Sequence, residues 1–137
     1  MTFNNPWDPN KSTMEIKKDR FYTKDHEWAK LNDDGTYTIG VTQFAVDQLG
    51  DITLVNIDVS VGDNIQSGQP FGTVESVKTL SDLFCPITGV VKEINTALDD
   101  QPELINESVW DNGWMIIIEP TEDVAIMSPE EYEKEIS

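Results

Sequence analysis

The stretch VGDNIQSGQPFGTVESVKTLSDLFCPITGVVKEIN, residues 61–95, decides the fold of this chain. Its first half has glycine-containing turns at 62–63 and 67–68, followed by a run of strand-forming residues. Its second half reads as a strand, a turn at 86–89 and another strand. If the two halves are antiparallel neighbours, Lys78 lies near their connection, where its flexible stem carries the amine into solvent. The stretch therefore predicts β-structure that presents a lysine on a hairpin.

The rest of the chain adds further strands and two short helices. A hairpin is predicted over 27–41, because Asn-Asp-Asp-Gly at 32–35 separates two strand-like runs. Residues 42–49 predict a short helix that Gly50 closes, and Ser-Pro-Glu-Glu at 128–131 opens a second one as a capping box. Strands are predicted at 52–57, 70–76, 83–85, 90–94 and 114–119. The fold class predicted is mainly β: a flattened barrel-sandwich hybrid of two antiparallel sheets with short peripheral helices.

Length and composition limit the number of domains and the kinds of partner. A chain of 137 residues with 38% hydrophobic content is long enough for one modest core. Nine basic against 26 acidic side chains give a net charge of −17, which opposes binding to nucleic acid or to an anionic membrane surface. The sequence has no apolar run long enough to span a membrane. We expect a monomer located in the cytoplasm.

The chain divides into an extension and a folded domain. Residues 1–20 are polar and show no sustained periodicity, so we expect an N-terminal extension with little regular structure. The extension contains acids and a single arginine, which is atypical of an organelle-targeting peptide. Residues 21–137 are expected to form the domain, including its C-terminal helix.

A series of motifs resembles the lipoyl-bearing H proteins of the glycine cleavage system. The motifs keep the order and spacing of that family over most of the chain from about residue 21 onward. They are YTKDHEW (22–28), GVTQFAVDQLGDI (40–52), VGD (61–63), ESVK with SDL (75–83), PITGVV (86–91), LINES (104–108), DNGWMIII (111–118) and MSPEEY (127–132). Each motif alone is weak, but their joint order is hard to produce by chance. The resemblance implies a fold of the lipoyl/biotinyl type.

The resemblance also implies a function and a set of site residues. Lys78 would be amide-linked to lipoate, and the protein would be a carrier without a catalytic site of its own. Its partners would be glycine decarboxylase, aminomethyltransferase, dihydrolipoyl dehydrogenase and lipoylating enzymes. Glu75 and Asp82 would help a lipoylating enzyme to recognise the target lysine. The cleft that shelters the loaded arm would be formed by Asp25, Glu27, Val41, Ala45 and Leu49, and Asp82 would contribute to it as well.

Three alternative functions for Lys78 compete with the lipoyl-carrier role. A biotinyl domain fits poorly, because its lysine usually lies between two methionines whereas Lys78 lies between Val77 and Thr79. A Schiff-base enzyme would need a desolvating pocket to lower the lysine pKa, and a hairpin tip supplies none. A protein that mainly donates lipoyl groups to other lipoyl-dependent complexes stays open.

The remaining reactive residue types suggest no other chemistry. His26 is the single histidine, so a histidine-rich metal site is impossible and no metal ligand set is predicted. Cys85 is the single cysteine and follows Phe84 in a predicted strand, which favours burial as a small apolar side chain. It also forbids an internal disulfide, as suits a reducing compartment.

Overall fold

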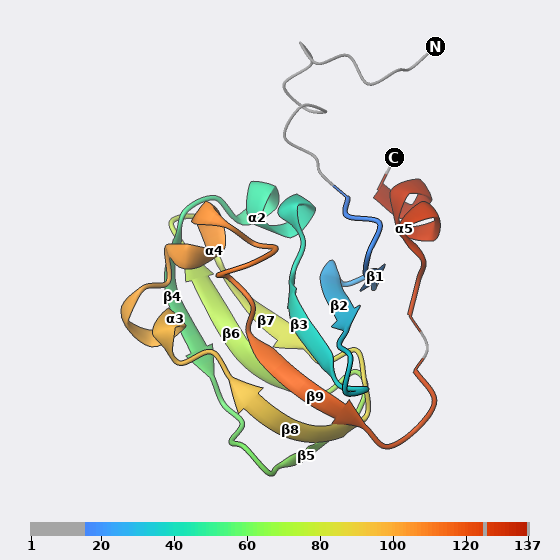
Figure 1. Cartoon of the computed structure of the whole chain (residues 1–137). Helices are drawn as coiled ribbons and strands as arrows, with labels where there is room; N and C mark the ends of the chain where they lie inside the picture. The colour runs from blue at the N-terminus through green and yellow to red at the C-terminus, as the bar shows by residue number, and fades with distance from the viewer. Residues whose placement is uncertain (1–15, 125, 137) are drawn as a thin grey trace, which may run out of the picture.

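The computed structural model describes residues 16–124 and 126–136, which form two packed antiparallel sheets with short helices around them (Figure 1). The larger sheet contains, in spatial order, β1 (Phe21–Tyr22), β2 (Glu27–Leu31), β3 (Tyr37–Val41), β9 (Ile116–Pro120), β8 (Gly89–Ile94) and β5 (Asn64–Ile65). The smaller sheet contains β4 (Ile52–Ile57), β6 (Pro70–Ser76) and β7 (Leu80–Phe84). The helices are α2 (Gln43–Leu49), α3 (Ala97–Asp100), α4 (Leu104–Glu107) and α5 (Pro129–Ile136). The predicted fold class is confirmed.

Local sequence signals explain several of these elements. The β2–β3 hairpin turns where Gly35 adopts a φ of +88°, a conformation that glycine takes without steric cost. Helix α2 begins at Thr42, whose hydroxyl accepts a hydrogen bond from the Ala45 amide, and it ends at Gly50. Helix α5 has the reciprocal bonds of a capping box between Ser128 and Glu131. These three predictions are confirmed.

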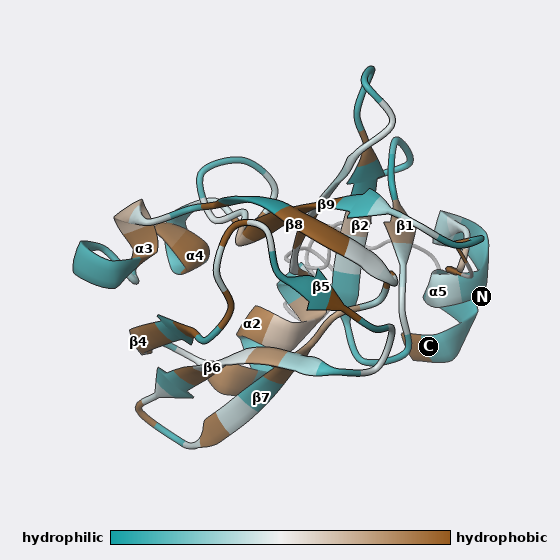
Figure 2. Ribbon diagram, turned by 90° about the horizontal axis from the view of Figure 1, so that it is seen from below, coloured by the Kyte–Doolittle hydropathy of each residue, from teal (hydrophilic) through white to brown (hydrophobic). Residues whose placement is uncertain are grey.

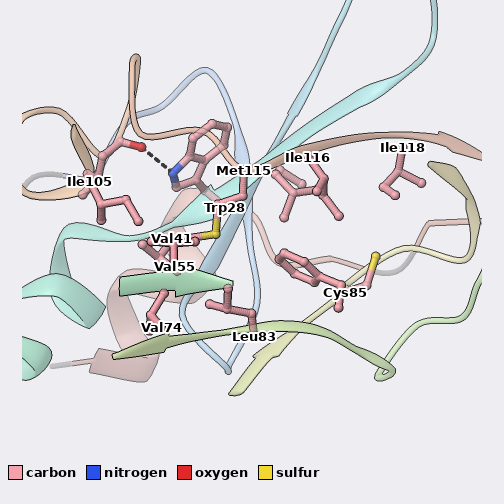
Figure 3. Close-up of a cluster of buried hydrophobic side chains, with 14 of the residues drawn as sticks. Trp28, Val41, Val55, Val74, Leu83, Cys85, Ile105, Met115, Ile116 and Ile118 are labelled. Carbon is pink, nitrogen blue, oxygen red and sulfur yellow. Dashed lines mark hydrogen bonds between the residues drawn. The ribbon is translucent and has the colours of Figure 1, made fainter. Parts of the chain in front are cut away.

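The two sheets face each other across one apolar core. In Figure 2, β8 and β9 lie in one layer, and β4, β6 and β7 lie in the other. Figure 3 shows side chains of both layers, such as Val74, Leu83 and Ile116, between the sheets. Trp28 is 1% exposed and its indole N–H donates to the carbonyl of Val109 at 3.0 Å.

Close packing on Trp28 also explains a glycine in the opposite strand. Gly40 pairs with Trp28 in the β2–β3 register. A Cβ atom at Gly40 would lie 2.5 Å from Cζ2 of the indole, closer than real contacts allow. The glycine in the YTIGV strand therefore leaves room for the tryptophan ring.

Other boundaries differ from the prediction. The strand predicted at 83–85 begins at Leu80, because β7 pairs with β6 from the Glu75–Leu80 pair onward, and it ends before Cys85. The strand predicted at 114–119 is Ile116–Pro120. The two-residue strands β1 and β5 and the four-residue helices α3 and α4 were not predicted, because such short elements have no periodicity to detect.

Residues 1–15 of the predicted extension lie outside the described residues, but Arg20 packs into the domain. Its side chain is 4% exposed, and its guanidinium carbon lies 4.6 Å from the ring centroid of Trp28 and 5.2 Å from that of Trp110. It donates a hydrogen bond to the Trp110 carbonyl at 3.2 Å and pairs with Asp19. No helix in the part of the chain that the structure describes is long and apolar enough to cross a membrane.

Candidate functional site

The connection between β6 and β7 holds Lys78 in an ordered turn. The Ser76 hydroxyl accepts hydrogen bonds from the amides of Lys78 and Thr79, each at 3.1 Å. The Ser76 amide donates to the Thr79 carbonyl at 2.8 Å and closes the turn. Serine suits this position because its short hydroxyl bonds readily to backbone amides two and three residues ahead. The fixed turn leaves the Lys78 side chain exposed, with no ion pair in the described part of the chain.

A second contact comes from the end of α2. A Cβ atom added at Gly50 would lie 3.6 Å from Cε of Lys78, so the lysine stem runs beside this glycine. Asn106, in the LINES motif, holds the same corner: its amide donates to the Gly50 carbonyl at 3.0 Å, and its carbonyl accepts from the Ile52 amide at 2.8 Å. The sequence alone gave no role to Ser76 or Asn106. The sequence feature that could have pointed to them is that each lies within one of the motifs shared with the family.

The two acids predicted to aid recognition flank this turn. Glu75 is exposed near the end of β6, opposite Leu80, and Asp82 is exposed on β7, opposite Thr73. Because directly opposite residues of an antiparallel pair share a face, both acids point to the outer side of the smaller sheet. Glu75 and Asp82 are therefore accessible to a protein that approaches Lys78 from that side.

Glu27, in contrast, is a buried carboxyl. Its side chain is 3% exposed, and the Thr23 hydroxyl donates to its Oε1 at 2.7 Å. Burial raises the pKa of Glu27 to about 7, because the charged form loses its hydration. Hydrogen bonds from Thr23 and from the backbone of Phe84 favour the charged form and oppose that rise in pKa.

Glu27 and the exposed Asp25 line a cavity of about 530 Å³. The cavity lies between the β1–β2 turn, the turns at 67–68 and 85–86, and helix α5. Asp82 lies outside this lining, as do Val41, Ala45 and Leu49. The structure thus groups two of the predicted cleft residues, Asp25 and Glu27, around the cavity and places the other four elsewhere.

Val41, Ala45 and Leu49 lie along the segment that leads from Glu27 towards Lys78: Val41 ends β3, whereas Ala45 and Leu49 belong to α2. Val41 is buried opposite Glu27 in the β2–β3 register, immediately before the helix. Ala45 and Leu49 are partly buried and lie four residues apart, hence on one face of the helix. At the far end, Gly50 lies beside the lysine stem. The segment from Val41 to Gly50 therefore leads from the buried carboxyl to the Lys78 stem.

Strand β7 runs between the same two places. It begins at Leu80, next to the Lys78 turn, and ends at Phe84, whose backbone favours the charged form of Glu27. At the rise of an extended strand, these four steps span roughly 13 Å. A lysine extended by an acyl chain has a reach of this order.

A hydrogen-bonded chain ties α5 to α2 beside the cavity. The Tyr132 hydroxyl lies 2.8 Å from Nδ1 of His26 and 2.9 Å from Oγ1 of Thr42, the residue that caps α2. His26 adopts a φ of +67°, uncommon for a residue with a side chain, and its ring lies against Phe44 at 4.5 Å between centroids. Burial lowers the pKa of His26. The sequence gave no indication that His26 and Tyr132 would meet.

Cys85 is buried, and its thiol donates to the Ile87 carbonyl at 3.1 Å. Burial raises the pKa of this thiol to about 11, which disfavours the reactive thiolate. Burial as a small apolar side chain is confirmed, although Cys85 follows the strand rather than lying in it. Among residues 16–124 and 126–136, no three His, Cys, Asp or Glu side chains group as a metal ion would require.

Comparison with known proteins gives the same family at the level of sequence and of structure. The family profile described as Glycine cleavage H-protein matches residues 20–137. A glycine cleavage system H protein of Listeria monocytogenes serotype 4a is 48% identical over 124 residues, which cover 88% of this chain and 98% of the relative. One of Rubrobacter xylanophilus is 43% identical over 122 residues, or 89% of this chain and 95% of the relative.

A solved structure agrees with the sequence relatives. The crystal structure of a glycine cleavage system H protein from Mycobacterium marinum matches with a TM-score of 0.82 and 36% identity, over 88% of this chain and 98% of that chain. Profile, relatives and structure each cover nearly the whole domain. This chain belongs to the glycine cleavage H-protein family.

Proposed function

We propose that this protein is the covalent lipoyl carrier of a glycine cleavage system, with Lys78 as the attachment site. The observation that carries the proposal is the Lys78 turn: an ordered backbone presents an exposed amine that forms no ion pair in the described part of the chain. An acylating enzyme needs such an amine, because a lysine engaged in a salt bridge would first have to leave its partner. Family membership supports the carrier role itself.

The residues around Lys78 fit a lipoyl group. Attached lipoate would supply a dithiolane that accepts an aminomethyl group and electrons and later releases both. The Lys78 stem and its turn would tether this group, which keeps its concentration high at each docked partner. The partners we propose are glycine decarboxylase, aminomethyltransferase, dihydrolipoyl dehydrogenase and the lipoylating enzymes. We further propose that the protein acts as a monomer in the cytoplasm.

Glu27 and α2 would shelter the loaded arm. An aminomethyl nitrogen is cationic, and an ionised carboxylate is the group that holds it best in a partly dry site. A cation beside Glu27 would also favour the charged form of this carboxyl and lower its pKa again. Ala45 and Leu49 offer the arm's chain an apolar surface along the way, and Asp25 adds a second negative charge at the cavity.

The test is modification of the purified protein. Each of three proteins, the parent, Lys78→Arg and the control Lys92→Arg, would be incubated with a lipoylating enzyme, lipoate and ATP, which activates the lipoate carboxylate for amide formation. We expect the parent and Lys92→Arg to gain one lipoyl group, mapped to Lys78, and to support glycine cleavage in a reconstituted system. Lys78→Arg should fold, stay unmodified and support none. Lipoate on Lys92 or Lys24, or full activity of Lys78→Arg, would refute the assignment.

A further inference from the structure

The surface around Lys78 is unusually apolar for an exposed turn. The described part of the chain exposes six large apolar side chains, and three of them are near this lysine. They are Leu54, Val77 and Leu80, which are 47%, 68% and 63% exposed. Val77 is the neighbour of Lys78 in the turn, and Leu80 begins the strand that leaves it. An exposed apolar group of this kind, next to a functional residue, suggests a surface that is covered in a complex.

The strand register places two of these three side chains, Leu54 and Leu80, in one row with Glu75. Leu54 on β4 is opposite Glu75 on β6, and Glu75 is opposite Leu80 on β7. Opposite residues share a face, and adjacent strands lie about 4.8 Å apart. The carboxylate therefore stands between two exposed leucines on the outer side of the smaller sheet. We name these three residues the outer row.

The acidic charge of this region limits which proteins could bind to the outer row. Residues 51–84 contain five acids and a single cation, Lys78. The Glu75 carboxylate has no ion pair or hydrogen bond with any described residue. A complementary surface would thus bring a basic side chain to Glu75 and apolar side chains to the leucines. A second copy of this chain would instead bring carboxylates together, on a molecule whose net charge is −17.

We infer that the outer row of Leu54, Glu75 and Leu80 is the docking surface for the enzyme that acylates Lys78. The inference rests on the proposed function. An extended lysine stem reaches roughly 6 Å from its Cα atom, given bond lengths near 1.5 Å. An active site that takes the amine must therefore come within that distance of the turn and cover the strands beside it. The enzyme presents a basic side chain flanked by apolar ones to this row.

The test compares exposed leucines near Lys78 with exposed apolar residues elsewhere. Leu54→Ser and Leu80→Ser, singly and together, are matched by Leu31→Ser and Val61→Ser, which are 51% and 63% exposed in the parent. A purified lipoate–protein ligase would modify each apo-protein, with the product followed by intact mass. We expect the double variant to lose at least tenfold in kcat/KM, chiefly through KM, and the controls to stay within twofold. Thermal midpoints should show that all variants are folded.

The outcomes separate this inference from the proposed function. Normal kcat/KM in the folded double variant, with full modification of the parent, would refute the docking surface and leave the carrier role intact. Absence of lipoate from Lys78 in the parent itself would refute the carrier role. If the double variant loses its fold, Leu80→Ser decides alone, with an expected loss of at least threefold. Sedimentation of the parent as a dimer that Leu80→Ser dissociates would show that a second copy covers the row, against the inference.

Discussion

Replacement of Glu27 by glutamine should change how the stability of this protein depends on pH. The carboxyl is 3% exposed, and burial raises its pKa from the ordinary 4.5 to about 7. Glutamine has nearly the shape of the protonated acid, and its carbonyl can still accept the hydrogen bond from Thr23. It cannot ionise. The substitution therefore removes the cost of charging a buried group and little else.

The sign and size follow from the two pKa values. In the unfolded chain, Glu27 loses its proton near pH 4.5, whereas in the folded chain it keeps the proton until about pH 7. The folded state thus binds more protons across this window, so the Glu27 contribution to stability is greatest below pH 4.5 and falls as the pH rises to about 7. At about 1.4 kcal/mol for each pKa unit, the loss amounts to about 3 kcal/mol and stays constant at higher pH.

Urea unfolding at a series of pH values measures this effect. Other carboxyl groups also titrate, so the quantity to follow is the difference in unfolding free energy between Glu27→Gln and the parent. From about pH 5 to pH 8, this difference should shift by about 2 to 3 kcal/mol in favour of the variant. The control Glu75→Gln replaces an exposed acid and should show almost no such shift. A difference for Glu27→Gln that does not vary with pH would refute the reasoning.

Three other substitutions test the site and its supports. Tyr132→Phe removes the hydroxyl that contacts His26 and the α2 N-cap. Urea unfolding should show that the unfolding free energy falls by about 1 to 3 kcal/mol. Unchanged stability would contradict a role for these bonds. Glu75→Ala and Asp82→Ala should slow lipoylation while shifting the thermal midpoint little, and the opposite pattern would make these acids structural. In Glu27→Gln, the aminomethyl-loaded protein should release ammonia and formaldehyde faster without the transferase, whereas release at the parental rate would argue against a protective carboxylate.

The sequence predicted well those elements whose signals are local. The turn at 32–35, the Thr42 cap and the capping box at Ser128 act within four residues of their own position. Strands β4 and β6 matched the predicted bounds, since turn-forming residues limit each of them. The start of β7 did not match, because pairing with β6 rather than its own composition sets where it begins.

The features of the candidate site also fall into those that local sequence predicted and those that depend on distant contacts. Turn-forming residues on both sides placed Lys78 near a hairpin connection, and the structure confirms an ordered turn there. The burial of Glu27 could not be read from DHEW, since a glutamate beside a histidine is ordinarily exposed. The bond from Tyr132 to His26 joins residues 106 positions apart, so no local pattern could reveal it.

By itself, therefore, the sequence determined the fold class, the family and the lysine on its turn. Short motifs and their order predict these properties, because turn and cap preferences act over a few neighbouring residues. Tertiary structure alone decided that Glu27 is buried, that α2 and β7 both lead from it to Lys78, and that Leu54, Glu75 and Leu80 share a row. Burial, pKa and shared faces depend on which distant segments pack together, and that is settled only when the two sheets close on one core.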